Sequence, residues 1–284
     1  MSAIILWFVL SLVFGGSLVL PQGFDLFGFE IRYYGLILAT AVWVSFWVLQ
    51  KQFTKNFSSI VIDQKLSLEN FVVVILVCGF IGARAYHVVT DFELYRDNLV
   101  GIVAVWNGGL SIFGAVAGGF IGAVIVWRFW LKNLSISLLQ WLDVLAPSVL
   151  VGQIIGRLGN LFNYEAYGLP TNLPWKMFVP VDFRSLDYLS VAFYHTVFLY
   201  EMILGLLLLW LILKRIESHY YVGKIFATWL VGYGLIRLVS ELFRLDHHDV
   251  AGISINYITP ICFILIGLAL YFWRIRFKIQ RYEK

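Results

Sequence analysis

Charged side chains are rare in this sequence, and several of them interrupt long apolar stretches. Arg84, Arg157, Arg237, Glu241 and Arg244 all lie toward the ends of such stretches. The cations among them outnumber the single acid that could neutralise them. Because a guanidinium group binds phosphate oxygens through paired hydrogen bonds, the pattern favours a site for a phosphate anion. The alternative is a structural ion-pair ladder, and for Arg244 taken alone we favour that alternative.

A dense group of polar residues ends one apolar stretch, within residues 152–168. Arg157 and Asn160 are three positions apart, so on a helix their side chains point to one side. The glycines of this segment allow a backbone or a ligand to approach closely. Helix packing explains those glycines but leaves Arg157, Asn160, Asn163 and Glu165 without a reason. We therefore interpret this segment as part of a binding site.

Two weaker features complete the list of candidate sites. Residues 106–111 contain two glycines, and if they open a helix their free N–H groups could receive an anion, although a plain entry turn is equally compatible. His195 lies close in sequence to Tyr200 and Glu201 and is a candidate acid/base group. No convergent set of metal ligands is evident, so we predict neither a metal nor another cofactor.

The composition indicates what must position these residues. Hydrophobic residues make up 61% of the 284-residue chain and charged residues only 13%, and the mean hydropathy is +0.84. These values exclude an ordinary soluble domain and predict an all-α, polytopic membrane bundle, because hydrocarbon leaves backbone groups no partner outside a helix. Eight apolar runs are long enough to span. They are residues 3–20, 32–50, 70–90, 106–131, 137–157, 193–213, 224–244 and 254–273.

Lysine and arginine in the short loops predict the orientation of these spans. Basic residues gather after spans two, four and six and in the C-terminal tail, which places both termini in the cytoplasm. The candidate arginines then lie toward the outer face. We expect an extra N-terminal span in residues 1–21, one membrane domain in residues 22–284, and a small outer cap in residues 158–192. Cys78 and Cys262 lie within apolar runs and are interpreted as small core residues.

The motif in residues 156–168 resembles the signature of the prolipoprotein diacylglyceryl transferase family. It reads Gly-Arg-Leu-Gly-Asn-Leu-Phe-Asn-Tyr-Glu-Ala-Tyr-Gly. Other stretches also resemble family motifs and occur in the same order along the chain as in the family. They are residues 34–35, 82–86, 106–111, 195 with 199–201, and 232–234 followed by Arg237, Glu241 and Arg244. The resemblance extends over about residues 22–275, so it implies seven family spans and leaves the first apolar run as an addition.

The resemblance implies transfer of the diacylglyceryl group of phosphatidylglycerol to the lipobox cysteine thiol of a prolipoprotein, at the outer leaflet of a bacterial inner membrane. Glycerol phosphate leaves, and arginines stabilise the charge that develops on it. We expect Arg157 and Arg237 at the phosphate, Glu241 orienting Arg237, and His195 as a catalytic group. The residues expected around the substrates are Arg84, Tyr34, Tyr86, Asn107, Gly108, Asn160, Glu165, Gly168, Tyr200, Glu201 and Arg244. The expected partners are phosphatidylglycerol, the precursor's signal peptide and membrane lipids, and we expect no nucleic acid because no basic stripe alternates with aromatic residues.

The sequence departs from the family at the group that would accept the thiol proton. The family histidine favoured for that step corresponds to Phe113, which accepts no proton. Three hypotheses follow: His195 or His87 replaces it, the thiol needs no protein base, or the chain keeps the lipid-binding fold but has another substrate or no activity. A transporter or flippase of anionic lipid is the alternative from another class, although the charges gather at one interface and no internal repeat is visible.

Overall fold

The computed structural model describes residues 19–58, 67–96, 99–217, 221–245, 249–250 and 253–277. These residues are mostly helical and form no closed sheet, which confirms the predicted all-α membrane fold. The long helices are α2 (Tyr33–Asn56), α4 (Leu68–Thr90), α5 (Ile112–Val126), α6 (Leu138–Asn163), α7 (Val197–Glu217), α8 (Lys224–Glu241) and α9 (Ile255–Phe277). A π turn, Trp127–Leu131, and a 3₁₀ turn, Lys132–Leu134, continue α5. The described residues also form three antiparallel pairs of short strands. β1 (Gly23–Leu26) pairs with β2 (Phe29–Arg32), and β3 (Met177–Phe178) pairs with β4 (Phe193–Tyr194). β5 (Asp249–Val250) pairs with β6 (Ile253–Ser254).

Within the described residues, six helices are long and apolar enough to cross a membrane: α2, α4, α5 with its extension, α6, α7 and α9. The seventh predicted span corresponds to α8, which has 18 residues and includes three charged ones, Lys224, Arg237 and Glu241. It packs between α7 and α9, so neighbouring protein surrounds these charges. The predicted N-terminal span, residues 3–20, lies outside the described residues except for Val19 and Leu20.

Among the helix boundaries that differ from the predictions, two bear on the candidate site residues. α6 continues to Asn163, so Arg157 and Asn160 lie on a helix and the extramembrane cap begins only after residue 163. α5 begins at Ile112, so Asn107 and Gly108 belong to the preceding loop rather than to a helix N-terminus. At the end of α6 and at the start of α5, glycines and polar residues made the helix boundary hard to predict. Such residues are compatible with either a helix end or a loop.

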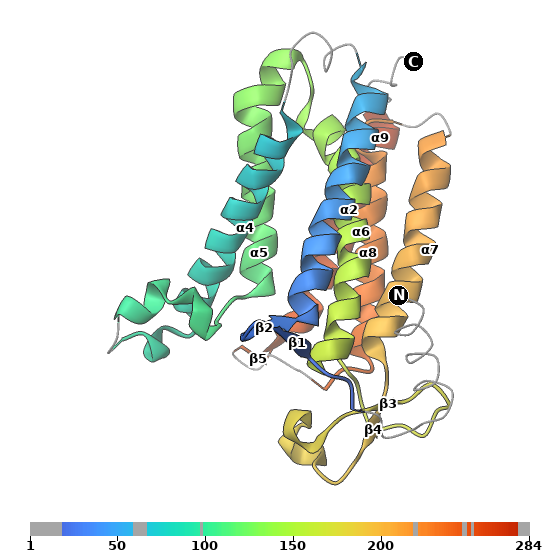
Figure 1. Cartoon of the computed structure of the whole chain (residues 1–284). Coiled ribbons are helices and arrows are strands. Elements are labelled where there is room, and N and C mark those ends of the chain that lie inside the picture. Colours follow the sequence, from blue (N-terminus) through green and yellow to red (C-terminus); the bar gives the residue numbers. More distant parts are fainter. Residues whose placement is uncertain are drawn as a thin grey trace. The chain divides into compact units, whose positions relative to one another are not determined.

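The chain forms two compact units, Met1–Val48 with Leu145–Lys284, and Leu49–Val144, and each is described by itself. In the first unit, α7, α8 and α9 lie alongside the C-terminal part of α6 (Figure 1). Half of the residues in the 18-residue apolar stretch of α6 are buried, compared with 11% in the corresponding stretch of α2. α6 is therefore the central helix. Its core joins α6 residues Leu150 and Ile154 to α7 residue Ile212 and α8 residue Ile225.

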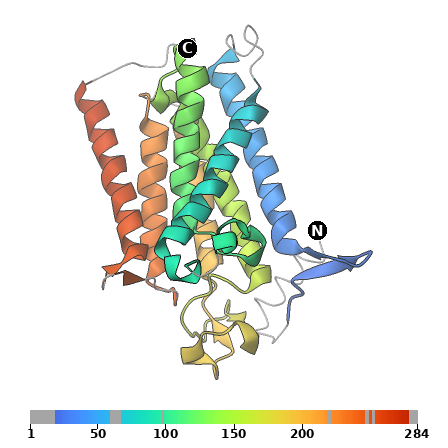
Figure 2. The same cartoon turned by 90° about the vertical axis from the view of Figure 1, so that its left-hand side faces the viewer.

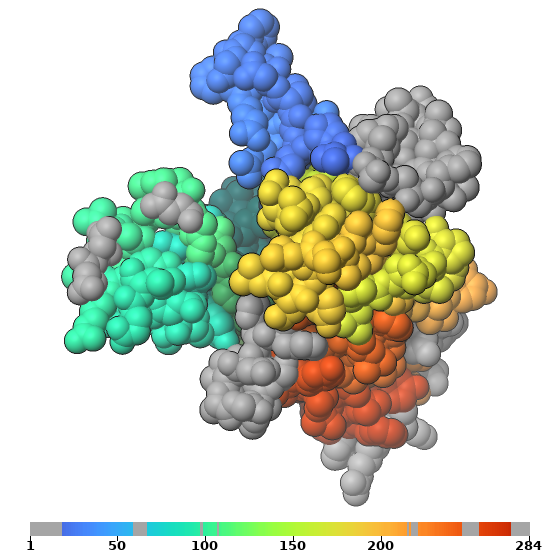
Figure 3. All heavy atoms as spheres, turned by 90° about the horizontal axis from the view of Figure 1, so that it is seen from below, coloured from blue at the N-terminus to red at the C-terminus, as the bar shows by residue number. Residues whose placement is uncertain are grey.

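The segment between α6 and α7 forms the cap of this unit. It is drawn in yellow, and in the view from below it spreads over the end at which α6 finishes and α7 begins (Figure 3). A second core holds it in place, in which Val179, Tyr194 and Phe198 are fully buried beside Phe162 of α6. The cap is therefore an ordered lid over the end of the unit that carries residues 156–168.

The second unit is built on the close pair α4 and α5, which lie side by side in both views (Figures 1 and 2). Gly114, Gly118 and Gly122 recur every fourth residue and form a smooth face on α5. A Cβ atom added to Gly114 would collide with the backbone carbonyl of Gly82 on α4. Small residues at this spacing allow two membrane helices to approach at backbone distance.

Candidate active site

The signature segment is held by α6 and by a tyrosine at the start of α2. A Cβ atom on Gly159 would come within 2.6 Å of the Tyr34 ring, so the glycine makes room for that ring. Tyr34 in turn lies within electrostatic range of both Arg157 and Glu165. Asn160 is buried, and its backbone carbonyl accepts a hydrogen bond from the Glu165 amide at 3.0 Å. The structure thus brings four of the predicted site residues together.

Glu201 of α7 is the centre of an ion-pair network. Its carboxylate contacts Arg157 Nη2 through Oε2 and Arg237 Nη1 through Oε1, the latter at 2.7 Å. Arg244 Nη1 lies 3.9 Å from the same Oε1 atom. The Glu201 side chain is 2% exposed, whereas the three arginines are 15–21% exposed. The acid is therefore withdrawn behind the arginines, which keep an accessible edge.

Glu241 of α8 is the second buried acid of this network. Its Oε2 atom lies 3.3 Å from Arg237 Nη2 and 3.9 Å from Arg244 Nε, and its Oε1 atom accepts a hydrogen bond from Asn256 Nδ2 at 2.7 Å. Glu241 thus forms an ion pair with Arg237, the residue that we expect it to orient. Asn256 belongs to α9, so the network connects α6, α7, α8 and α9.

Three arginines and two glutamates meet in this network, in a site that protein largely shields from water. The guanidinium groups keep partly exposed edges. A phosphodiester carries one negative charge and offers oxygens to those edges.

A small cleft between α6, α7 and α8 reaches Arg157. Its polar walls are Gln153, Arg157, Glu201 and Tyr233, and the remaining walls are apolar. Tyr233 hydrogen-bonds Arg157 through its side chain. The cleft therefore joins an apolar lining to the Arg157–Glu201 ion pair.

The cap closes on this site through backbone pairing. Gly168 pairs with Arg244, its N–H donates to the His195 carbonyl at 2.9 Å, and the Leu169 N–H donates to the Phe243 carbonyl at 2.8 Å. A Cβ atom on Gly168 would collide with the Phe243 carbonyl. Gly168 therefore permits the contact that joins the end of the signature, the histidine and the end of α8.

His195 is held by a chain of side-chain hydrogen bonds. Its Nδ1 atom lies 3.0 Å from Tyr200 Oη, which also accepts a hydrogen bond from Trp175 Nε1 at 2.8 Å. The ring packs on Phe243, with centroids 5.1 Å apart. Burial lowers the pKa of His195, so the imidazole is neutral at pH 7.

Glu165 projects from a strained turn at the end of α6. The residues on either side of it, Tyr164 and Ala166, have φ angles of 55° and 53°, in the left-handed region that favours glycine. Two hydroxyls fix this turn, because Tyr164 Oη donates to the Leu20 carbonyl at 3.1 Å and Tyr167 Oη donates to the Phe183 carbonyl at 2.6 Å. The turn keeps Glu165 exposed, in an open, mostly polar pocket that Asn163 also lines.

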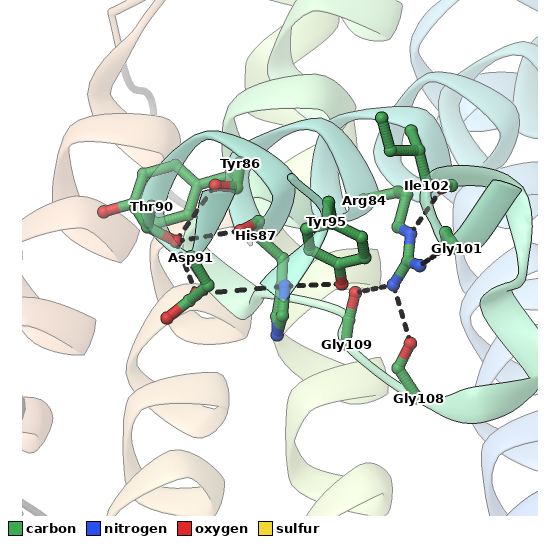
Figure 4. Close-up of polar contacts among 10 residues, drawn as sticks. All are labelled: Arg84, Tyr86, His87, Thr90, Asp91, Tyr95, Gly101, Ile102, Gly108 and Gly109. Carbon is green, nitrogen blue, oxygen red and sulfur yellow. Dashed lines mark hydrogen bonds and ion pairs between the residues drawn. The ribbon is translucent and has the colours of Figure 1, made fainter. Parts of the chain in front are cut away.

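Arg84 belongs to the second unit and has different partners from those expected. Its guanidinium donates to four backbone carbonyls, those of Gly101, Ile102, Gly108 and Gly109, at 2.5–2.8 Å (Figure 4). It is 8% exposed. Its positive charge is thus balanced by carbonyl dipoles of the loop between α4 and α5, rather than by an anion.

The remaining predicted residues of this unit surround Arg84. Tyr95 lies under the Arg84 guanidinium at 5.0 Å, and its hydroxyl lies 3.0 Å from His87 Nδ1 (Figure 4). Tyr86 packs against Phe113, with ring centroids 6.0 Å apart. Gly108 contributes a carbonyl to Arg84, while the side chain of Asn107 lies outside the described part of the structure.

Sequence reasoning overlooked three polar residues of the site. Asn256, Tyr233 and Trp175 contact Glu241, Arg157 and Tyr200, respectively. Asn256 carried a usable signal, because it is a polar residue at the predicted outer end of an apolar run. In the described ranges, no group of three or more His, Cys, Asp or Glu side chains is placed to hold a metal ion.

Comparison with known proteins identifies the family. Residues 21–273 match the family described as prolipoprotein diacylglyceryl transferase. A Thermotoga petrophila protein named phosphatidylglycerol–prolipoprotein diacylglyceryl transferase is 36% identical over 271 residues, covering 93% of this chain and 88% of its own length. A protein of the same name from Synechocystis is 35% identical over 263 residues, covering 89% of this chain and 88% of its own. The chain belongs to the prolipoprotein diacylglyceryl transferase family.

Proposed function

We propose that this protein transfers the diacylglyceryl group of phosphatidylglycerol to the cysteine thiol of a prolipoprotein and releases glycerol phosphate. The observation that carries the proposal is the network of Arg157, Arg237 and Arg244 around two buried glutamates, in which the three guanidinium groups keep partly exposed edges. Phosphatidylglycerol supplies a phosphodiester anion that these edges can bind.

The reaction explains why the arginines are held so firmly. The sulfur attacks the glycerol carbon that bears the phosphate, a C–S bond forms, and the C–O bond breaks with its electron pair remaining on the phosphate oxygen. The phosphate therefore gains negative charge in the transition state. Arg157 and Arg237, oriented by Glu201 and Glu241, stabilise that charge without having to reorganise. In this scheme Tyr34, Asn160, Glu165 and Gly168 shape the head-group site.

Arg84 has a different role in this proposal. Because its donors already bind four carbonyls, we assign it to folding the loop between α4 and α5 rather than to the phosphate. His87, in the same cluster, remains a candidate acceptor for the thiol proton in place of the histidine that Phe113 replaces.

One assay tests the function. Purified protein is given phosphatidylglycerol labelled in its head-group glycerol, together with a peptide containing a lipobox cysteine. We expect release of labelled glycerol phosphate and addition of the diacylglyceryl mass to the peptide, and a loss of at least about 100-fold in Arg157→Ala. Arg96→Ala is the matched control, since Arg96 is 68% exposed and belongs to the other unit. Lipid binding without turnover would instead support an inactive member, and lipid movement across vesicles without peptide modification would support a transporter.

The orientation in the membrane is a further part of the proposal. The distribution of lysine and arginine supports cytoplasmic termini and a cap at the outer face of the inner membrane, with residues 1–21 as an extra span. A cysteine-free variant, made by replacing Cys78 and Cys262, provides the background for Asn172→Cys in the cap. An impermeant maleimide should label this cysteine in intact spheroplasts. Labelling only after lysis would reverse the orientation.

A further inference from the structure

The hydrogen bonds around His195 have a direction. A tryptophan N–H is a donor only, so Trp175 Nε1 must donate to Tyr200 Oη, at 2.8 Å. The Tyr200 hydroxyl then needs an acceptor for its own proton. Among the described residues, the acceptor within hydrogen-bond distance is His195 Nδ1, at 3.0 Å.

This direction favours one tautomer of the histidine. If Nδ1 accepts the Tyr200 proton, the neutral ring carries its own proton on Nε2. The opposite arrangement, with Nδ1 donating, would give Tyr200 Oη two donors and leave its own proton without a partner in the described structure. Burial lowers the pKa of His195, which keeps the ring in this neutral form at pH 7. The free edge of His195 is thus an N–H group and not a lone pair.

The histidine lies beside the arginine network. Its backbone carbonyl accepts the N–H of Gly168, which pairs with Arg244, and its ring packs on Phe243. Tyr200 adjoins Glu201, the centre of the network. The titratable groups around His195 are therefore Tyr200 of α7 and, across Gly168, Arg244, which lies just after the end of α8.

We propose that His195 is a neutral hydrogen-bond donor to the departing phosphate, through Nε2–H, and is not the base that deprotonates the thiol. This inference rests on the proposed function. The leaving group passes from a monoanionic diester to a dianionic monoester, so it gains a second negative charge beside the arginines. A neutral N–H donor adds stabilisation for the second charge without losing its proton.

The transfer reaction balances in protons and electrons when His195 does not accept the thiol proton. The S–H bond breaks, its electron pair stays on sulfur, and the proton passes to water. The sulfur then forms the C–S bond, and the C–O pair leaves with glycerol phosphate. An ordinary cysteine pKa of about 8.5 leaves a few per cent of the thiol ionised at pH 7.

Two substitutions separate a donor from a base. The amide nitrogen of glutamine reaches the place of Nε2, and that of asparagine reaches the place of Nδ1. We expect His195→Gln to keep kcat within about threefold of the unmodified enzyme and His195→Asn to lose about 100-fold. The pH dependence of kcat/KM should be the same for His195→Gln and the unmodified enzyme. Equal losses in both variants, with both folded by thermal unfolding, would show a base and overturn the proposal; full activity in both would also overturn it.

A second measurement does not depend on turnover. In protein labelled with ¹⁵N-histidine, the His195 resonances, assigned by their absence in His195→Gln, should show the tautomer protonated at Nε2. Tyr200→Phe should shift them toward a mixture of tautomers. An Nδ1-protonated ring would refute the inference even if the enzyme proved inactive, whereas inactivity with the Nε2 tautomer would count against the proposed function alone.

Discussion

Arg157 of α6 and Glu201 of α7 form an ion pair in which the acid is almost completely buried and the arginine keeps an exposed edge. This asymmetry distinguishes a binding site from a ladder that satisfies itself. The acid holds the guanidinium in place from behind, and the remaining N–H groups stay available to an incoming anion.

Glu201→Gln should therefore be damaging although the side chain keeps its shape. Removing one partner of a buried ion pair costs about 3–5 kcal/mol, because it leaves the arginines repelling one another. We expect a lower thermal unfolding midpoint and a fall in kcat of about 100-fold, since the guanidinium groups lose their orientation. Glu93→Gln is the control, because Glu93 is 85% exposed and pairs only with Arg96 in the described structure. Unchanged turnover in Glu201→Gln would show that this carboxylate does not organise the arginines.

Arg84→Lys tests whether Arg84 supports the loop or binds the lipid. An ammonium group has three N–H donors on a single atom and cannot reach four separate carbonyls. We expect a loss of about 2 kcal/mol and faster hydrogen exchange at the amides of Ala104 and Gly108, which bond within this loop. Arg96→Lys should leave exchange unchanged. A raised KM for phosphatidylglycerol with unchanged exchange would contradict the structural role.

The sequence was sufficient for most of the fold, because apolar runs of the required length determine where helices can cross. It was less reliable at helix ends. Residues 158–163 include Gly159, Asn160 and Asn163 and were expected to leave the membrane, yet they continue α6.

The partners of the charged residues were harder to predict. The excess of arginines was visible in the sequence, but the role of Glu201 depends on how α7 packs against α6 and α8, which spacing along the chain does not reveal. Arg84 was expected to need an anion. Glycine-rich backbone can neutralise an arginine too, and the glycines at positions 101, 108 and 109 were the signal for it.

The stability of the folded protein should depend on His195 at mildly acidic pH. Its pKa is lowered in the folded state by burial, so the unfolded chain binds the proton more readily. Stability is unaffected by this group above its ordinary pKa of about 6.5, and it decreases as the pH falls below that value toward the folded pKa. His195→Gln should flatten this part of the curve of unfolding midpoint against pH. An equally steep curve in the variant would assign the acid sensitivity to other groups.

Two glycines of the signature provide a matched pair for testing Tyr34. A Cβ atom at Gly156 meets no heavy atom within 4 Å, whereas one at Gly159 comes within 2.6 Å of the Tyr34 ring. Gly156→Ala should be neutral or should stabilise α6 by up to about 1 kcal/mol, because alanine is the better helix former. Gly159→Ala should displace Tyr34 from its place near Arg157 and Glu165, lowering kcat while the helix persists.

The double variant Gly159→Ala with Tyr34→Ala separates crowding from chemistry. Removing the ring relieves the collision, so the unfolding midpoint should recover relative to Gly159→Ala alone. Turnover should stay low, because the hydroxyl that interacts electrostatically with Arg157 and Glu165 is now missing. Recovery of both stability and turnover would mean that Tyr34 only fills space beside α6, and that the head group is positioned by the arginines without it.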